Sequence, residues 1–117
     1  MGTFTVLLGI GSSDGQSFRE VEALVDTGAT FTCVPADLLR ELGHRALGSE
    51  RFELGDGRVV ERDLTEAPVR IDGKTRISIC VFADEGSTTL LGAVTLEQFL
   101  LAPDQVGRGL VPVRGCV

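Results

Sequence analysis

Apolar and polar residues alternate along several short stretches of the chain. Between Thr3 and Gly11 every second position is apolar: Phe4, Val6, Leu8 and Ile10. From Ile77 to Val81, apolar side chains again alternate with Ser78 and Cys80. A period of two is typical of strands that bury one face, so the pattern predicts a β-rich chain.

Asp-Gly pairs separate these alternating stretches. They occur at Asp14-Gly15, Asp56-Gly57 and Asp72-Gly73. Both residue types tolerate a positive φ, and Asp-Gly between alternating segments is a strong hairpin signal. The sequence therefore predicts three hairpins, which join residues 3–11 to 18–25, 50–54 to 58–64, and 68–71 to 75–83.

Two segments have a helical pattern instead. Pro35 can open a helix that ends at Gly43, with an apolar face formed by Leu38, Leu39 and Leu42. Thr95 and Gln98 have capping-box spacing, which predicts a second helix that starts at Thr95 and ends before Pro103. A final strand is expected from Leu110 to Val117. No linker interrupts the pattern, so residues 1–117 are expected to form a single domain.

Composition and charge narrow the function. Apolar residues make up 43% of the 117 residues, which excludes a disordered chain, and the core must be aliphatic because Trp and Tyr are absent. The net charge of −6 and the scattered cations argue against nucleic acid and against an anionic membrane surface as partners. No apolar stretch approaches the roughly 20 residues that a membrane span needs.

The cysteine and histidine content indicates a reducing compartment without a metal. Cys33, Cys80 and Cys116 lie far apart, and His44 is the single histidine, so neither a disulfide framework nor a zinc site is expected. We expect packed thiols, a histidine at the surface, no metal and no cofactor. Residues 1–11 lack the features of a signal peptide, and a cytoplasmic location is expected.

The segment with the most chemistry is Asp26-Thr27-Gly28. It lies between an apolar strand, Ala23 to Val25, and a second apolar segment that begins at Phe31. A carboxylate in such a setting is partly buried and needs hydrogen bonds, which the Thr27 hydroxyl and the Gly28 amide can donate. Gly28 would also permit a sharp turn. The simpler interpretation is an Asx turn at the end of a strand.

Three features together resemble the single-domain, retropepsin-like aspartic proteases, and the small bacterial members most closely. Residues 26–29 match the catalytic motif of that family, and Leu90-Leu91-Gly92 matches its second signature before a carboxy-terminal helix. Residues 52–64, with residues 54–58 at the tip, resemble its flap hairpin. The resemblance implies an all-β fold: a small closed barrel of six to eight strands with one or two short helices.

The resemblance also implies a reaction. Aspartic proteases use two carboxylates that share one proton, but this chain has a single Asp-Thr-Gly. The second carboxylate must then come from a two-fold homodimer in which the two copies of Asp26 meet. The expected activity is an aspartic endopeptidase that hydrolyses a peptide or protein substrate. Cys33 is not expected to act as a nucleophile, because no histidine lies in a supporting pattern.

The site residues implied by the resemblance fall into two groups. Catalytic roles are assigned to Asp26, Thr27 and Gly28, with Thr27 expected to bond across the dimer axis. Substrate-binding roles are assigned to Ala29, Leu54, Gly55, Asp56, Gly57, Arg58, Thr89 and Leu90. Further pocket candidates, which fit the core equally well, are Ala23, Leu24 and Val59.

Two features, the flap tip and the residue after Gly28, depart from better-known relatives. Asp56 and Arg58 place charges at a flap tip that is glycine-rich and apolar in viral members, and an exposed turn is the favoured interpretation. Ala29 has no hydroxyl to donate to the carboxylates, so we expect a less acidic pH optimum than in pepsin-like enzymes.

Two other functions fit parts of the pattern. A dimeric, non-proteolytic module that binds peptides or regulates a partner is compatible with the same fold. The pattern Asp26-x-Gly28-x-Thr30 also resembles the phosphate-binding hairpin of actin-like ATPases, but their fold needs two α/β lobes and a much longer chain.

Overall fold

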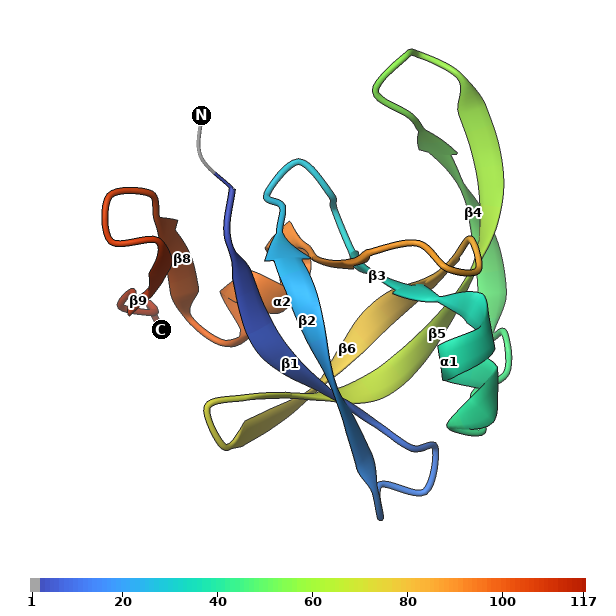
Figure 1. The fold of residues 1–117 in the computed structure, drawn as a ribbon, viewed down its shortest axis with the longest axis horizontal. Helices are drawn as coiled ribbons and strands as arrows, with labels where there is room; N and C mark the ends of the chain where they lie inside the picture. Colours follow the sequence, from blue (N-terminus) through green and yellow to red (C-terminus); the bar gives the residue numbers. More distant parts are fainter. Residues whose placement is uncertain (1–2) are drawn as a thin grey trace.

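The computed structural model describes residues 3–117, which form nine strands and two short helices (Figure 1). The elements, in chain order, are β1 Thr5–Gly11, β2 Phe18–Val25, β3 Thr32–Pro35, α1 Ala36–Glu41, β4 Gly48–Glu53, β5 Val59–Ile71, β6 Lys74–Ala83, β7 Thr89–Leu91, α2 Ala93–Gln98, β8 Leu101–Asp104 and β9 Gly109–Pro112. Within residues 3–117, no helix is long and apolar enough to cross a membrane.

Seven of the strands form one sheet that closes into a barrel. Their order is β1-β2-β7-β3-β6-β5-β4, and β1 also pairs with β5 through Gly9↔Arg70 and Ile10↔Val69. This pairing closes a ring of six strands and leaves β4 outside it, paired only with the first half of β5. The closed, mostly β barrel with two short helices confirms the predicted fold class.

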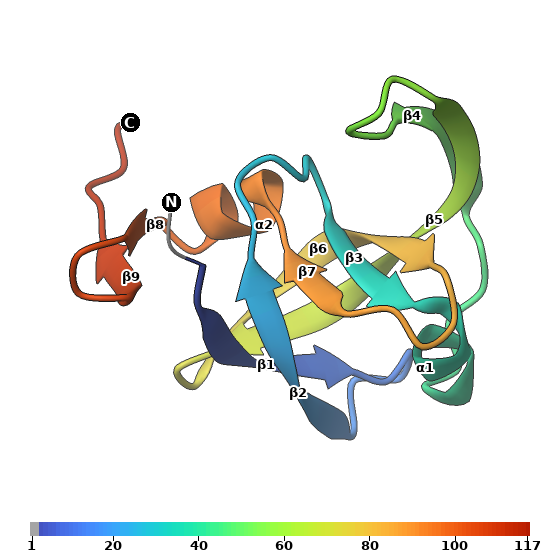
Figure 2. The same cartoon turned by 45° about the horizontal axis from the view of Figure 1, so that its top comes forward.

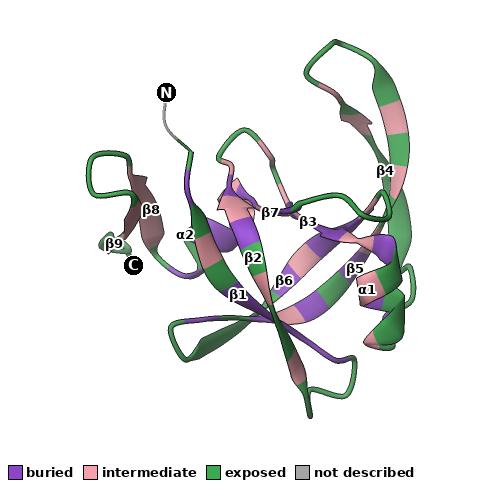
Figure 3. Ribbon diagram, in the orientation of Figure 1, coloured by how far each residue is buried: buried purple, intermediate pink, exposed green. Residues whose placement is uncertain are grey.

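The barrel is filled mainly with aliphatic side chains, and phenylalanine is the only aromatic residue type in this chain without Trp or Tyr; Phe4, Phe82 and Phe99 belong to the core. Figure 3 shows that the buried residues concentrate in the barrel strands, whereas the β4–β5 hairpin and the β8–β9 hairpin are mostly exposed or half-buried. The largest fully buried apolar side chains are Leu8, Ile10, Val34, Leu39, Val69 and Leu91. Because these come from both ends of the sequence, one core holds the whole chain together.

All three Asp-Gly pairs lie in hairpin turns, but the turns have two different backbone conformations. At Asp72-Gly73 both residues have a positive φ, of 50° and 80°. Asp14 and Asp56 instead accept the backbone N–H two residues ahead, at 3.0 Å in each case, and only the glycine has a positive φ. These two are Asx turns, in which the carboxylate replaces a backbone acceptor.

One predicted boundary inside the hairpins is wrong. Residues 58–64 and 68–71 were expected to be separate strands, but β5 runs without a break from Val59 to Ile71. Proline has no N–H, so within a sheet it usually interrupts a strand. Pro68 is tolerated here because the pairing of β5 with β1 stops at Val69 and does not include it.

The C-terminal elements also differ from the prediction. Helix α2 begins at Ala93, and Thr95 is buried inside it with its hydroxyl bonded to Thr32, so it is not the N-cap. The chain leaves the helix after Gln98, because Leu100 adopts a φ of 54°. Pro103 therefore ends no helix and lies in β8.

The expected last strand, residues 110–117, is instead a hairpin. Strands β8 and β9 pair with each other and with no other strand among the described residues, and residues 113–117 lie beyond β9. In Figures 1 and 2 this hairpin lies at the side of the barrel away from β4, and Arg108 Nη2 donates to the Thr3 carbonyl at 2.9 Å.

Helix α1 confirms the predicted helix between Pro35 and Gly43. The prediction that His44 lies at the surface is wrong. The helix spans Ala36–Glu41, and Gly43 follows it with a φ of 89°. His44 is only 5% exposed, and its Nε2 lies 2.7 Å from the Gly11 carbonyl oxygen. The left-handed conformation of Gly43 reverses the chain after α1 and places His44 against Gly11. His44 is therefore buried rather than at the surface.

Candidate active site

Asp26 lies at the point where β2 ends and the chain turns away from the barrel. Val25 at the end of β2 is buried, and its N–H donates to the Phe4 carbonyl at 3.0 Å. The next N–H, that of Asp26, donates to the Leu91 carbonyl at 3.0 Å. The backbone of Asp26 is therefore held by β7, while its half-buried side chain faces a groove.

The loop after Asp26 folds back onto the carboxylate. Gly28 N–H donates to Asp26 Oδ1 at 2.9 Å, and Ala29 N–H donates to the Asp26 carbonyl at 3.1 Å. A Cβ on Gly28 would lie 3.1 Å from Asp26 Oδ1, and Gly28 does not have a positive φ. The sharp turn predicted from sequence is present, but glycine is favoured in it by the space beside the carboxylate and not by a positive φ.

Helix α2 holds the same loop from behind. Its first two N–H groups, on Ala93 and Val94, donate to the carbonyls of Ala29 and Thr30 at 2.8 and 3.0 Å. A Cβ on the preceding Gly92 would lie 2.5 Å from the Phe31 carbonyl carbon, which is closer than real contacts allow. The glycine of Leu90-Leu91-Gly92 therefore lets the helix terminus pack directly on the active-site loop.

Buried hydroxyls complete this attachment. Thr95 Oγ1 lies 2.6 Å from Thr32 Oγ1 and 2.7 Å from Ser78 Oγ, and Gly92 N–H donates to Thr32 Oγ1 at 3.1 Å. These contacts join α2, β3 and β6 by one continuous hydrogen-bonded chain inside the core. Such a chain fixes geometry because each hydroxyl would be costly to leave without a partner.

A groove of about 1130 Å³ separates the Asp26 loop from the underside of the β4–β5 hairpin. As Figure 2 shows, the hairpin projects from the barrel and curves back toward the turn between β2 and β3. We call this hairpin, residues 48–64, the flap. Its register places Phe52 opposite Val60 and Glu50 opposite Arg62. The groove thus has an apolar middle and a charged end.

Six of the predicted site residues line this groove: Asp26, Gly28, Ala29, Leu54, Gly55 and Leu90. Thr27 is exposed on the loop beside it. Thr89, predicted to contact substrate, is buried in the core and paired with Ala23, so its side chain does not line the groove. The candidates Leu24 and Val59 also lie outside the groove.

The charged flap tip forms a local turn, as the sequence interpretation favoured. Arg58 donates to the Asp56 carboxylate from its backbone N–H at 3.0 Å and from Nε at 2.7 Å. These two bonds lower the pKa of Asp56 below its ordinary value, the backbone bond being the larger cause. Asp56, Gly57 and Arg58 are exposed and do not line the groove of this single chain, and their substrate-binding role stays a prediction.

Sequence reasoning missed much of the groove wall. The rings of Phe31 and Phe52 meet edge to face, with centroids 6.1 Å apart, and so connect the active-site loop to the flap. Alternation along β5 was the available signal, since it places Val60, Arg62 and Leu64 toward the groove. β4 gives no such signal, because its residues 50–53 all line the groove. The other missed lining residues are Thr30, Cys33, Glu50, Arg51, Glu53, Val60, Arg62, Leu64, Ile79, Val81, Ala83, Asp84, Ser87 and Thr88.

The three thiols have different environments. Burial, and to a lesser degree the Asp26 carboxylate, raise the pKa of Cys33, which is the opposite of what a nucleophilic cysteine requires. Cys80 is buried, as expected for a packed thiol. Cys116 was also expected to be packed, but it is exposed in this chain. Among residues 3–117, no three His, Cys, Asp or Glu side chains gather closely enough to hold a metal ion.

Known proteins resemble this chain at the level of the family. A family model described as gag-polyprotein putative aspartyl protease matches residues 15–98, which include the Asp26 loop, the flap and α2. No curated protein matches the chain.

Solved retroviral proteases share the fold. The simian foamy virus (mac) protease aligns with a TM-score of 0.59 and 18% identity, over 86% of this chain and 99% of that chain. The EIAV protease, solved with an inhibitor, aligns with a TM-score of 0.62 and 19% identity, over 94% of this chain and 93% of that chain. With a matching family model across most of its length and this fold, the chain belongs to the gag-polyprotein aspartyl protease family and is a retropepsin-like aspartic protease.

Proposed function

We propose that this chain is an aspartic endopeptidase whose active form is a homodimer. The observation that carries the proposal is the Asp26 carboxylate, held by the Gly28 N–H at 2.9 Å and facing a groove large enough for an extended peptide. One chain supplies one such Asp-Thr-Gly. Two copies of Asp26, brought together on a two-fold axis, would supply the pair of carboxylates that the reaction needs.

The chemistry follows from one shared proton. Two carboxylates a few ångströms apart do not both ionise easily, so one stays protonated. The ionised carboxylate takes a proton from water, whose oxygen bonds to the carbonyl carbon of the scissile peptide. The protonated carboxylate donates to the carbonyl oxygen. Breakage of the C–N bond then yields a carboxylic acid and an amine, and the amine leaves with a proton.

The groove supports an extended peptide as substrate. Its apolar wall, which includes Phe52, Leu54 and Leu90, can bury apolar side chains. Gly55, on the flap side of the groove, would offer its backbone groups to a strand-like peptide. The backbone N–H and carbonyl of Ala29 are already bonded to Asp26 and Ala93, so Ala29 would contact the peptide as part of the groove wall. Asp56, Gly57 and Arg58 would act at the outside of the flap. Thr27, exposed on the loop, is free to bond to its counterpart across the dimer axis.

A cytoplasmic location is part of the same proposal. Cys33, Cys80 and Cys116 are all free thiols, and thiols persist in reducing compartments.

The test compares the wild-type protein with Asp26→Asn on a random peptide library between about pH 3 and pH 7. We expect the substitution to lower cleavage by about a thousandfold or more, because an amide cannot accept the proton of water. Asp37→Asn, an exposed position in the first turn of α1, is the matched control and should cleave like wild type. Equal cleavage by wild type and Asp26→Asn would disprove the proteolytic mechanism. A wild type that binds peptides without cleaving them would favour the binding-module alternative.

A further inference from the structure

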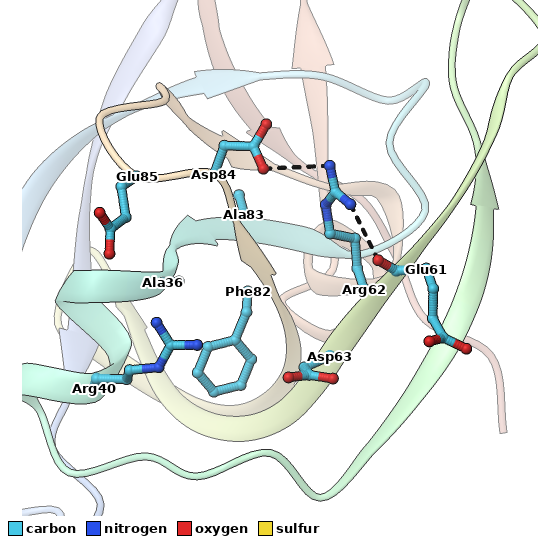
Figure 4. Close-up of a pocket in the computed structure, with 9 residues that line it drawn as sticks. All are labelled: Ala36, Arg40, Glu61, Arg62, Asp63, Phe82, Ala83, Asp84 and Glu85. Atoms are coloured by element: carbon cyan, nitrogen blue, oxygen red, sulfur yellow. Dashed lines mark hydrogen bonds and ion pairs between the residues drawn. The ribbon is translucent and has the colours of Figure 1, made fainter.

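A second, smaller pocket opens beside the groove, where β5 and β6 separate. Their pairing ends at Leu64↔Val81, after which β5 rises into the flap while Phe82 and Ala83 of β6 stay paired with β3. The space between the two strands is a pocket of about 320 Å³ (Figure 4), which we call the wedge pocket. Its lining residues are Ala36, Arg40, Glu61, Arg62, Asp63, Phe82, Ala83, Asp84 and Glu85.

The wedge pocket adjoins the groove and is separated from it by one side chain. Arg62, Ala83 and Asp84 line both spaces. The Arg62 side chain forms the partition: it donates to the Glu61 carbonyl at 3.0 Å and to Asp84 Oδ1 at 3.3 Å. The Asp84 side chain is 79% exposed, and exposed ion pairs of this kind contribute little free energy. The partition can therefore rearrange at small cost.

The wedge pocket has a mainly polar lining with an excess of carboxylates. Ala36, Phe82 and Ala83 supply a small apolar part of its wall, and the Arg40 guanidinium lies 5.6 Å from the centre of the Phe82 ring. Four acidic residues face two arginines in the lining. In the part of the chain that the structure describes, Asp63 and Glu85 take part in no salt bridge.

We propose that the wedge pocket is a substrate subsite that takes the side chain of a lysine or arginine from a peptide lying in the groove. The inference rests on the proposed function of the groove. A volume of about 320 Å³ is at the lower limit for ligand pockets and suits one long side chain. The methylene stem would pass the small apolar part of the wall, with the cationic head toward Asp63 and Glu85, which Figure 4 shows on two sides of the same hollow.

The charges favour this occupant over an acidic one. An acidic side chain would meet four carboxylates, while Arg62 is already bonded to Asp84 and Arg40 already lies on Phe82. Arg62 itself shows that a guanidinium fits between the backbone of β5 and the β6–β7 loop. The net charge of −6 adds a weak attraction for basic peptides over the whole chain.

The experiment sequences the products that wild type and two double variants release from a random peptide library. Asp63→Asn with Glu85→Gln removes two carboxylates from the wedge pocket and preserves their shape. Glu66→Gln with Asp72→Asn is the matched control, since both residues are exposed acids outside the groove and the wedge pocket.

We expect cleaved peptides to be enriched in Lys or Arg at a fixed distance from the cut. The enrichment should fall about twofold to fivefold per carboxylate in the pocket variant, the range for an exposed charge pair, and should persist in the control. It should also weaken as salt rises from about 50 to about 500 mM, because salt screens exposed charges. No enrichment, or equal enrichment in the pocket variant, would overturn the subsite.

A binding measurement separates this proposal from the proposed function. Immobilised Asp26→Asn protein is exposed to the same library, and the retained peptides are sequenced with and without the Asp63→Asn and Glu85→Gln changes. Retention that favours Lys or Arg and depends on those carboxylates would support the subsite even if wild type cleaves nothing. Retention without that preference would contradict the subsite whether or not wild type cleaves.

Discussion

At the scale of single residues, burial holds two thiols near the candidate site in their protonated form. Burial raises the pKa of Cys80 from 9.0 to about 12, with a smaller contribution from Cys33 on the neighbouring strand. In the unfolded chain the same thiol ionises near 9.0. Between about pH 9 and pH 12 the native state therefore binds more protons than the unfolded state, and the free energy of unfolding falls as the pH rises.

This pH dependence is tested by measuring the free energy of unfolding in urea for wild type and Cys80→Ala, at about pH 8 and at about pH 10.5. Wild type should lose about 1–2 kcal/mol more stability over this interval than the variant, since each pKa unit corresponds to about 1.4 kcal/mol. The variant is less stable at both pH values because of the cavity it leaves, so the difference between the two pH dependences is the quantity that matters. Parallel pH dependences would contradict the prediction.

His44 gives a second prediction at this scale. Its Nε2 bonds to the Gly11 carbonyl in a buried position, and its backbone N–H donates to the Leu39 carbonyl at 3.0 Å. His44→Ala should lower the free energy of unfolding by about 1–3 kcal/mol, because a buried carbonyl loses its partner. Thermal or urea unfolding measures the change, with Arg45→Ala on the exposed neighbour as control. A loss as small as that of the control would show that the bond contributes nothing.

The sequence predicted Asp26 but neither the burial of His44 nor that of Thr95. Asp26 was recognisable because its motif is local: the residues that surround the carboxylate are also its neighbours in the chain. His44 and Thr95 owe their burial to residues far away in the sequence, Gly11 for one and Thr32 and Ser78 for the other. A local pattern contains no information on such partners.

At the scale of elements, the active-site loop depends on the N-terminus of α2. Gly92 lies between the loop and the helix, and a methyl group there would come within 2.5 Å of the Phe31 backbone and 2.9 Å of the Ala29 carbonyl oxygen. Backbone atoms cannot move aside as a flexible side chain can, so the helix would have to shift. The loop would then lose the hydrogen bonds from Ala93 and Val94.

We therefore predict that Gly92→Ala destabilises the protein by about 1–3 kcal/mol, the usual cost of overpacking a core, and lowers peptide cleavage further than this loss explains. Gly48→Ala is the control, because a Cβ there would meet no atom within 4 Å beyond its chain neighbours, and its φ is not positive. Denaturation and library cleavage measure the two effects. If Gly92→Ala unfolded and cleaved peptides like Gly48→Ala, the dependence of the loop on Gly92 would be disproved.

Hairpins were predictable at this scale, but the order of the strands was not. Each Asp-Gly turn joins strands that are neighbours in the chain, so the turn residues alone predict their pairing. The pairing of β2 with β7, and of β3 with β6, joins strands far apart in sequence and in parallel. The continuity of β5 was missed for a related reason. Pro68 can lie inside the strand because the pairing of β5 with β1, which is distant in the sequence, ends at Val69.

At the scale of the whole molecule, the proposed active site is complete only in a dimer. The chain leaves apolar side chains exposed on the C-terminal hairpin and the residues after it, among them Val106, Val111 and Val113. Exposed apolar residues gathered on one element are typical of an interaction surface. A dimer that covers them would also protect the hairpin, which is poorly stable alone.

The prediction is that specific activity falls on dilution. Activity per mole should stay constant well above the dissociation constant of the dimer and decrease in proportion to concentration well below it, as the fraction of protein in dimers does. Sedimentation velocity on the same samples measures that fraction. Activity per mole that stays constant in a purely monomeric sample would contradict the shared pair of carboxylates.

The place of β7 in the barrel has a consequence for synthesis of the protein. Strand β7 lies between β2 and β3, so the two ends of the Asp26 loop do not pair with each other and are joined only through residues 89–91. The helix that holds the loop carbonyls comes later still. A chain emerging from the ribosome thus carries Asp26 early but cannot order the loop until most of the sequence has been made.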